Sequence, residues 1–447
     1  MDTTGLTLTD RANVGANISI SGSESSRHKS RVFSRAGAIQ SVFVFLMNRE
    51  YEGNSPAGRR FIHQYKIKHY QQALCDRNHQ ELAGHEDSVN QLLQVNGNTL
   101  VSVSDDPTVR VWSDKAGRWQ FVQALTLHSD RVHGLASLSD FRFVTCSHDR
   151  SVIIWHKLND DWREWTRIQT GRVCTDIIAL TPDNFIVTTS HGHVGSFHID
   201  GLECYPYWFN EYRDAIYNVT RLDAESFTLC TMDGIFAYWQ RRGSEWNRYN
   251  NHCPASIRNG GQNYPLTAVP LCEGIIAVGY SLGHIVVWWC HKYNESSGRL
   301  TWREMQTLEH GDEPEEVKGI LPISEVSFIS YGDDACMALW RLDHNKKWQL
   351  QQRIIDIHTY AIANCLEVFR DHYWSIDNSG AVHCWRWTGE ELVHECQRVS
   401  SRQDYDDAFL RSSGIRLLGL GYSDEVATFS EDCTIKIWPL FRAGIAE

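Results

Sequence analysis

Histidine, a hydroxyl-bearing residue and aspartate, three residue types that cooperate in hydrolytic acid–base chemistry, occur together in this chain at a repeated spacing. His85, Ser102 and Asp106 form one such set, and the same types recur in later segments. A hydrolase holds one catalytic set at one site. Because the sets recur from unit to unit, we interpret them as structural and expect no catalytic residues.

Other signals for catalysis or ligand binding are weak or missing. The sequence has no phosphate-binding G-x-x-x-x-G-K-[ST] loop, no G-x-S-x-G nucleophile motif and no strand-linked G-x-G-x-x-G motif. His191 and His193 flank a single glycine, and no third metal ligand is suggested nearby. We therefore expect neither a cofactor nor a bound metal.

Eight hydrophobic runs that each end on a large aromatic residue form the framework around these polar residues. The aromatic residues are Trp112, Trp155, Phe197, Trp239, Trp288, Trp340, Trp385 and Trp438. Their spacings are 43, 42, 42, 49, 52, 45 and 53 residues. A period in this range indicates one supersecondary unit repeated along the chain.

Each unit contains the pattern of four short strands. In the first unit these are SVNQLLQV, NTLVSVS, TVRVW and WQFVQALTL, and the second unit repeats the order. Alternating polarity and β-branched residues favour a small antiparallel sheet. One such sheet cannot bury both faces, whereas eight arranged radially bury them on their neighbours. The predicted fold is all-β, a single closed β-propeller of eight four-stranded blades, or of seven if unit three or five is not a full blade.

The last unit predicts how the ring closes. Only nine residues follow Trp438, and they show little β pattern, so this unit lacks a fourth strand of its own. Gln80–Ala83 precedes the first unit, at the place where a fourth strand belongs. We expect this segment to complete the last blade, which would remove the free strand edges of the ring.

Charge and cysteine usage limit the class of protein. Residues 80–447 carry 32 Lys and Arg against 49 Asp and Glu, whereas residues 1–79 carry 11 against 6. An acidic body argues against non-specific nucleic-acid binding and is compatible with basic protein partners. None of the 13 cysteines is paired as C-x-x-C, no signal peptide is evident, and the longest apolar stretch, Ala36–Met47, is too short to span a bilayer. We expect a cytoplasmic protein, with the nucleus as an alternative.

Four segments follow from these patterns. We expect a disordered tail at residues 1–31, an N-terminal extension on or beside the propeller at 32–79, the propeller at 80–440 and a C-terminal tail at 441–447. The extension is interpreted either as packed against the propeller or as a docking segment for a partner.

The first unit, GHEDSVNQLLQVNGNTLVSVSDDPTVRVW, resembles a repeat of the WD-repeat (tryptophan–aspartate) β-propeller family, and the resemblance extends over about residues 80–440. In that family a His, a Ser or Thr, an Asp and the Trp form a hydrogen-bonded structural tetrad. In unit seven Ser379 stands where the resemblance places the Asp, and unit eight keeps Asp432 but lacks the His. The resemblance implies three complete tetrads: His85, Ser102, Asp106 and Trp112; His128, Thr145, Asp149 and Trp155; His310, Ser330, Asp334 and Trp340.

Two acidic loops and one aromatic segment are candidate partner-binding sites. In the family, the loop before the first strand and the turn between the second and third strands share one rim, and both acidic loops are expected there. An acidic rim would attract a basic peptide, and an exposed aromatic cluster in the expected loop ECYPYWFNEYRDAIY would form a hot spot. The alternatives are solvated loops and core packing. The candidate residues are Asp312, Glu313, Glu315, Glu316, Asp404, Asp406, Asp407, Trp208 and Tyr212.

These observations favour a non-catalytic scaffold that assembles complexes by holding protein or peptide partners, basic ones included, on the propeller rim. We expect no small-molecule substrate, no direct contact with nucleic acid and no membrane. The alternative is a substrate-recognition subunit of a ubiquitin-ligase-type complex, although the W-D-x-R signature that some family members use for such docking is missing. An enzyme built on a propeller is a third hypothesis.

Overall fold

The computed structural model describes residues 79–439 with short gaps, and the structural statements below concern these residues. The gaps are 202, 253, 255, 258–262, 295–298, 313, 356, 359, 370, 400–415, 421–424 and 431–432. The expected tail at 1–31, nearly all of the extension at 32–79 and the expected C-terminal tail at 441–447 lie outside the described residues. None of the described segments is a helix of the length and apolarity that crossing a membrane requires.

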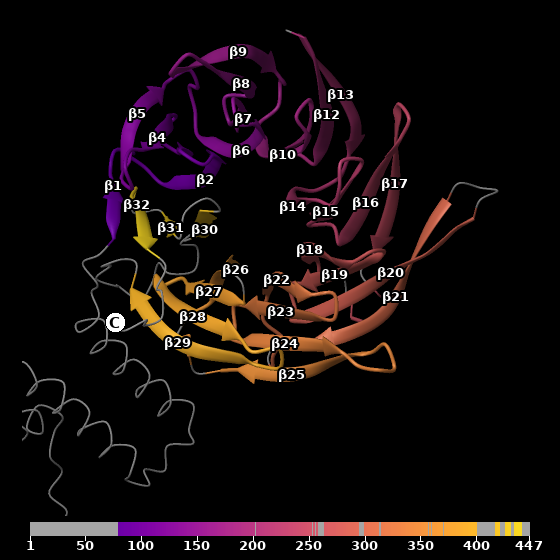
Figure 1. Ribbon diagram of the computed structural model, residues 1–447. Helices are drawn as coiled ribbons and strands as arrows, with labels where there is room; N and C mark the ends of the chain where they lie inside the picture. Colours follow the sequence, from indigo (N-terminus) through magenta and orange to yellow (C-terminus); the bar gives the residue numbers. More distant parts are fainter. Residues whose placement is uncertain are drawn as a thin grey trace, which may run out of the picture. The chain divides into compact units, whose positions relative to one another are not determined.

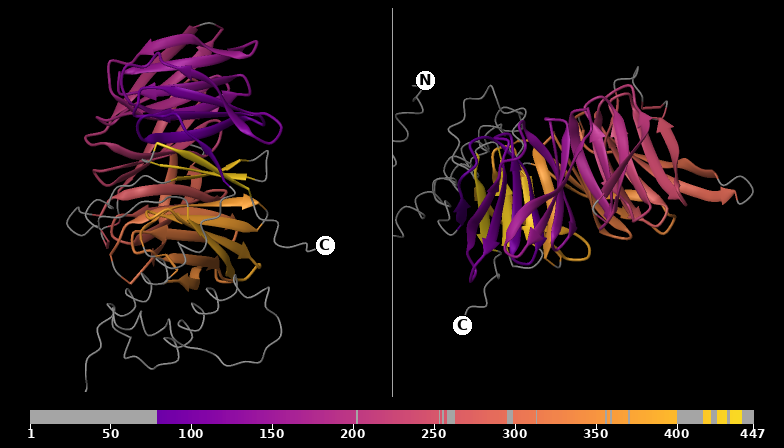
Figure 2. Two further views of the ribbon diagram at one scale, coloured as in Figure 1. Left: turned by 90° about the vertical axis from the view of Figure 1, so that its left-hand side faces the viewer. Right: turned by 90° about the horizontal axis from the view of Figure 1, so that it is seen from above.

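Eight four-stranded antiparallel sheets form a ring (Figure 1). Two further views show the sheets standing side by side as blades that follow one another in chain order (Figure 2). In seven blades the strand order follows the chain, from an innermost first strand to an outermost fourth strand. The predictions of an all-β propeller and of eight blades are confirmed, and the alternative of seven blades is wrong.

The strands of the first four blades, together with the strand that precedes them, occupy residues 80–252. They are β1 (Gln80–Leu82); in blade one β2 (Val89–Asn96), β3 (Thr99–Ser104), β4 (Val109–Asp114) and β5 (Trp119–Leu125); in blade two β6 (Val132–Ser139), β7 (Arg142–Ser147), β8 (Ser151–Leu158) and β9 (Asp161–Gln169); in blade three β10 (Cys174–Thr181), β11 (Asn184–Thr189), β12 (His193–Asp200) and β13 (Glu203–Glu211); in blade four β14 (Ile216–Arg221), β15 (Ser226–Thr231), β16 (Ile235–Arg242) and β17 (Glu245–His252).

The remaining strands form blades five to eight. They are, in blade five, β18 (Pro265–Cys272), β19 (Ile275–Tyr280), β20 (His284–Asn294) and β21 (Arg299–Glu309); in blade six β22 (Val317–Ser324), β23 (Ser327–Gly332), β24 (Met337–Leu342) and β25 (Trp348–Ile354); in blade seven β26 (Ile362–Phe369), β27 (His372–Asp377), β28 (Ala381–Trp387) and β29 (Leu392–Val399); in blade eight β30 (Arg416–Leu420), β31 (Glu425–Phe429) and β32 (Ile435–Pro439).

The closing strand joins the two ends of the ring. β1 pairs antiparallel with β32, so that Gln80 lies opposite Ile437 and Leu82 opposite Ile435. The predicted closure by the segment from Gln80 is therefore confirmed. The Gln80 side chain also exchanges two hydrogen bonds with the backbone of Trp119 on β5. β1 is thus tied to blade eight through the strand ladder and to blade one through a glutamine amide.

The same glutamine link joins the outermost strands of other neighbouring blades. Gln123 on β5 donates from Nε2 to the carbonyl of Trp162 and accepts from the N–H of Trp162, both at 2.9 Å. Each such amide satisfies one backbone donor and one acceptor on the next blade, which would otherwise need water. The further pairs are Gln306 with Trp348 and Gln352 with Leu392.

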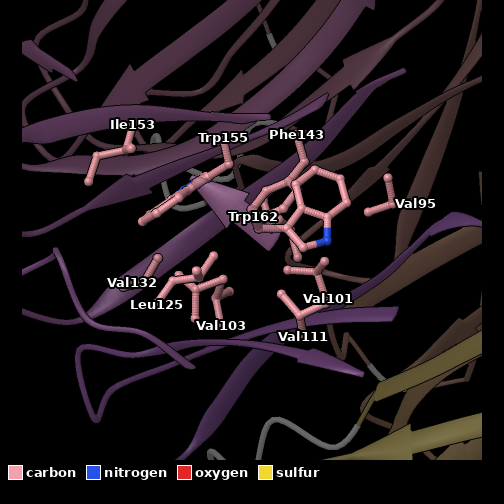
Figure 3. Packing of buried hydrophobic residues seen from close by; sticks show 12 residues of the cluster. Val95, Val101, Val103, Val111, Leu125, Val132, Phe143, Ile153, Trp155 and Trp162 are labelled. Carbon is pink, nitrogen blue, oxygen red and sulfur yellow. The ribbon is translucent and has the colours of Figure 1, made fainter. Parts of the chain in front are cut away.

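The hydrophobic core lies in layers between adjacent blades. Figure 3 shows the layer between blades one and two, where Val101, Val103 and Val111 face Trp155 and Trp162. All five side chains are almost completely buried. A fully buried valine contributes about 1.5–3 kcal/mol relative to an exposed one, so a layer of this kind between two blades holds the ring together.

The innermost strands of blades one to seven carry a β-bulge close to their first residue. A bulge leaves one residue outside the ladder and re-aims its side chain. These innermost strands all begin at the same end of the ring, so the bulge residues surround the ring axis there. They are Asn90, His133, Thr175, Tyr217, Leu266, Lys318 and Ala363.

The aromatic segment that was expected to be a loop is largely a strand. β13 (Glu203–Glu211) is the outermost strand of blade three and pairs with β12 along its length. Pro206 is compatible with this position because an outermost strand has one side without ladder partners. The interpretation of this segment as a loop is therefore wrong.

Candidate interaction surface

A hydrogen-bonded tetrad connects the loop before blade one to its second and third strands. His85 Nδ1 lies 2.7 Å from Asp106 Oδ2, and His85 Nε2 lies 2.8 Å from Ser102 Oγ. Trp112 Nε1 donates to the same Ser102 Oγ at 3.0 Å. The resemblance implied these four residues, and the structure brings them together. Ser102 is buried and already engaged, so this hydroxyl is not exposed to a substrate.

Blades two and six contain tetrads of the same composition. In blade two His128 lies 2.9 Å from Asp149 and 2.8 Å from Thr145, and Trp155 donates to Thr145 at 2.9 Å. In blade six the ring of the histidine is turned around. His310 Nδ1 lies 2.7 Å from Ser330 Oγ, to which Trp340 donates at 2.8 Å, and His310 Nε2 lies 3.3 Å from Asp334 Oδ1.

The tetrad carboxylates of blades one and two are held in their ionised form. Burial of Asp106 would raise its pKa, but hydrogen bonds from His85, from Thr108 and from the Glu86 N–H together lower the pKa well below its usual range. The pKa of Asp149 is lowered against burial in the same way, by His128 and by other hydrogen bonds. Both aspartates therefore act as fixed acceptors rather than as acids.

Blade seven corrects the expectation that Ser379 takes the place of the aspartate. The carboxylate comes instead from Asp377, two residues earlier, at 3.2 Å from His358 Nδ1. Ser379 donates its hydroxyl hydrogen to Asp377 at 2.5 Å, and His358 and Trp385 both bind Ser375 Oγ at 2.7 Å. In blade one the order is reversed, with Ser104 and Asp106 at these positions. The exchange preserves both groups, so the tetrad survives.

Blade four uses a different residue to satisfy its tryptophan. Trp239 Nε1 donates to the hydroxyl of Tyr212 at 3.0 Å. Tyr212 is only 6% exposed, so it packs in the core and cannot form the exposed patch for which it was a candidate. Its ring occupies the place before the first strand that the histidine has in blade one, and a phenol there reaches the indole without an intervening serine.

The other candidate of the aromatic segment also packs inward. Trp208 is half-buried, with its edge against Phe197 at 5.7 Å between ring centroids, and the guanidinium of Arg172 lies over its ring. Phe197 replaces the tryptophan in blade three and brings no N–H that would need an acceptor. Tyr205 and Tyr207 on the same strand are the exposed aromatic residues. Trp208 and Tyr212 therefore do not form an exposed cluster.

Blade eight keeps the tryptophan-to-hydroxyl bond, because Trp438 Nε1 donates to Thr428 Oγ1 at 3.0 Å. Asp432, the expected aspartate of this blade, lies outside the described residues. Asp404, Asp406 and Asp407 of the second acidic loop, and Glu313 of the first, lie outside them as well.

Two groups among the described residues have a composition that could hold a metal ion. They are His310, Asp334 and Cys336 in blade six and His358, Asp377 and His383 in blade seven, each with ligand atoms within 4.8 Å of one another. Both groups include tetrad members. The two ring nitrogens of His358 already contact Asp377 and Ser375, so an ion in blade seven would compete with the bonds that hold the blade together.

The histidine and aspartate of each tetrad mark one end of the ring, which we call the tetrad face. The first acidic loop lies there, between β21 and β22. The Asp312 side chain is 89% exposed and forms an ion pair with Arg353. Glu315 is exposed as well. Lys318 Nζ lies 2.5 Å from Glu316. Two of the candidate carboxylates, Asp312 and Glu316, are thus paired with basic side chains of the same chain. The net negative charge of this loop is therefore smaller than the sequence suggests.

The opposite part of the tetrad face, over blades one and two, carries a mixed group of charges. Asp105 lies 3.6 Å from Arg131 and 3.8 Å from His133, and it accepts a hydrogen bond from Asn90 at 2.7 Å. The rings of His133 and His148 stack at 4.4 Å. Burial, reinforced by His148, lowers the pKa of His133. Asp105 is therefore balanced by groups of its own chain.

Comparisons with known proteins agree with this geometry. The family model for the WD domain, G-beta repeat, matches residues 77–113 and 119–156. Apoptotic protease-activating factor 1 of Mus musculus is 32% identical over 108 residues, which are 24% of this chain and 8% of that protein. The chain therefore spans a small part of that relative.

Solved structures with the same fold include two of Sqt1. The Saccharomyces cerevisiae protein has a TM-score of 0.64 at 12% identity, over 80% of this chain and 97% of Sqt1. Sqt1 of Chaetomium thermophilum, bound to the N-terminus of the ribosomal protein L10, has a TM-score of 0.64 at 12% identity, over 80% and 98% of the two chains. At this identity the similarity concerns the fold alone.

Proposed function

We propose that this chain, a WD-repeat β-propeller of eight blades, is a non-catalytic scaffold that binds protein or peptide partners on its tetrad face. The observation that supports the proposal most is that charged and polar side chains gather at one end of this ring, the tetrad face. A ring of similar fold, Chaetomium thermophilum Sqt1, was solved with the N-terminus of a ribosomal protein. We infer that an extended peptide segment is the kind of partner that this chain also holds.

The recurring sets of histidine, hydroxyl residue and aspartate support a structural role. Ser102, Thr145 and Ser330 are completely buried, and each accepts a hydrogen bond from a tryptophan. A catalytic serine must reach a substrate, and these hydroxyls do not. The residues that remain for function are the bulge residues and loops of the tetrad face, which carry charges and aromatic rings at the surface.

Charge reversal on the tetrad face tests the proposal. The test variant carries Asp312→Lys, Glu315→Lys and Glu316→Lys. The control carries Asp160→Lys in the turn between β8 and β9 and Asp161→Lys at the first position of β9, at the other end of the ring. We expect affinity capture from the native cell to recover a partner with the unmodified chain and the control, and to lose it with the test variant. Equal capture by both variants at every salt concentration would argue against this face.

The same capture experiment separates the scaffold from a substrate-recognition subunit of a ubiquitin-ligase-type complex. In that alternative residues 32–79 dock the ligase core, so a chain without residues 1–79 would lose ligase components and keep other partners. The proposal expects no ligase component with either form. It also places the protein in the cytoplasm or the nucleus, which is consistent with free thiols at the ten cysteines whose side chains the structure describes.

A further inference from the structure

Two tyrosines from neighbouring blades stack at the inner part of the tetrad face. Tyr217 is the bulge residue of β14, and Tyr264 directly precedes β18. Their ring centroids lie 5.4 Å apart, and the ring planes are within 7° of parallel. Tyr217 is 46% exposed, and Tyr264 is half-buried beside it. The pair therefore presents an aromatic surface that the described residues leave uncovered.

An exposed methionine lies on the tetrad face of the same blade. Met232 follows β15 in the turn between the second and third strands of blade four and is 43% exposed. Its backbone N–H donates to the carbonyl of Ala215, two residues before Tyr217, at 3.1 Å. Among the described residues, Tyr217 is the only exposed large hydrophobic side chain that lies on an innermost strand. Exposed apolar side chains that gather on one part of a surface, as here on the inner part of the tetrad face, are typical of interaction sites.

Carboxylates border the aromatic surface on the side of blade six. Glu316 directly precedes β22, and its charge contributes, after burial and the contact with Tyr264, to raising the pKa of Tyr217 to about 12. Beyond it lie Glu315, Asp312 and Asp333, the last at 3.3 Å from Lys318. Among the described residues, four carboxylates face two cations here, Lys318 and Arg353. This side retains negative charge, in contrast to Asp105 over blades one and two.

Aromatic rings next to carboxylates match one kind of side chain. A cation is attracted electrostatically to an aromatic face, and a planar guanidinium can stack on a ring while it binds a carboxylate through two hydrogen bonds. Lysine offers the charge without the planar group. The apolar stem of an arginine would in addition cover Met232.

We infer that the Tyr217–Tyr264 pair seats an arginine side chain of a partner's extended peptide segment, with the guanidinium on the exposed face of Tyr217 and directed at Glu316. The inference rests on the proposed function, because it names the residue type that the tetrad face recognises. The inference specifies arginine at one position of the partner peptide and does not specify the residues at its other positions.

A peptide-display selection on the full chain tests the inference. The probe is a phage-displayed library of random peptides about twelve residues long, and the best peptide is then measured by fluorescence anisotropy. We expect the selected peptides to share one arginine. Replacing that arginine by glutamine, or introducing Tyr217→Ala, should weaken binding about 10-fold, which corresponds to 1.4 kcal/mol. Lysine at that position should bind more weakly than arginine.

Three further variants separate a binding role from a structural one. Tyr217→Phe keeps the ring face and should bind like the unmodified chain, whereas Glu316→Gln should weaken binding. Tyr207→Ala removes an exposed tyrosine from the outermost strand of blade three and should have no effect. Peptides whose binding depends neither on Tyr217 nor on an arginine would overturn the inference but would still support the proposed scaffold function. If the selection on the unmodified chain yields no peptide, both the inference and the proposed peptide binding fail.

Discussion

The indole nitrogen of Trp239 and the hydroxyl of Tyr212 form a direct hydrogen bond of 3.0 Å across 27 residues of sequence. In blade one, Trp112 reaches His85 through Ser102. His85 and Trp112 are also 27 residues apart. The phenol of Tyr212 replaces the histidine and the serine together, because a longer side chain spans the distance to the indole. The buried tryptophan N–H thus has an acceptor in either arrangement.

Tyr212→Phe should destabilise the protein. The substitution keeps the ring but removes the acceptor of Trp239 Nε1, and an unsatisfied buried donor costs about 1–3 kcal/mol. The thermal unfolding midpoint should fall accordingly. Tyr207→Phe is the matched control, because Tyr207 is 62% exposed and loses only contact with water. Equal midpoints for the two variants would show that the bond contributes no stability.

Asp106→Asn should remove a pH-dependent part of the stability. The pKa of Asp106 in the folded chain lies below that in the unfolded chain, so its stabilisation is complete above about pH 4 and is lost as the pH falls further. The variant should be less stable than the unmodified chain by about 1–3 kcal/mol at pH 7, and the difference should shrink below pH 4. Urea unfolding at several pH values measures this. Asp161→Asn, an exposed aspartate, should show no such trend.

Asp176→Asn should have the opposite effect. Burial raises the pKa of Asp176 to about 6, although the Ile177 N–H and Arg416 favour the charged form. The folded chain therefore holds a proton that the unfolded chain has already lost, and stability falls as the pH rises from about 4 to 6. The variant should be more stable than the unmodified chain at pH 8, by about 1–3 kcal/mol, and similar at pH 4. A variant that is less stable at pH 8 would contradict the assignment.

Ring closure should depend on the short strand β1. Leu82→Ala removes a buried side chain from the layer between blades eight and one and should cost about 2–5 kcal/mol. A chain that lacks residues 1–82 should in addition aggregate, because β32 becomes an open edge. The matched control lacks residues 1–78 and keeps β1. Light scattering and the thermal midpoint distinguish the two truncated chains; identical behaviour would mean that β1 is dispensable.

Some structural features were predictable from local residue patterns. The eight blades and the closing strand follow from the period of Trp112 and its equivalents and from the short segment after Trp438, because strand polarity and repeat length are local properties of a sequence. The sequence also contains a signal for the role of Tyr212. The number of residues between Tyr212 and Trp239 equals that between His85 and Trp112, which indicates that Tyr212 takes the place of the tetrad histidine. The glutamine links left another, because Gln80 and Gln123 recur at the repeat period.

The sequence alone thus determined the architecture, because seven of the eight blades are built from neighbours in the chain. Only the tertiary structure decided which residues meet between blades. Asp377 supplies the tetrad carboxylate of blade seven, although the sequence pattern pointed to position 379, because its place at the end of β27 brings it to His358. Tyr217 contacts Tyr264 although the two are 47 residues apart in the sequence. Such contacts depend on bulges that re-aim side chains and on how adjacent blades pack, and these are relations in space that residue types and spacing do not contain.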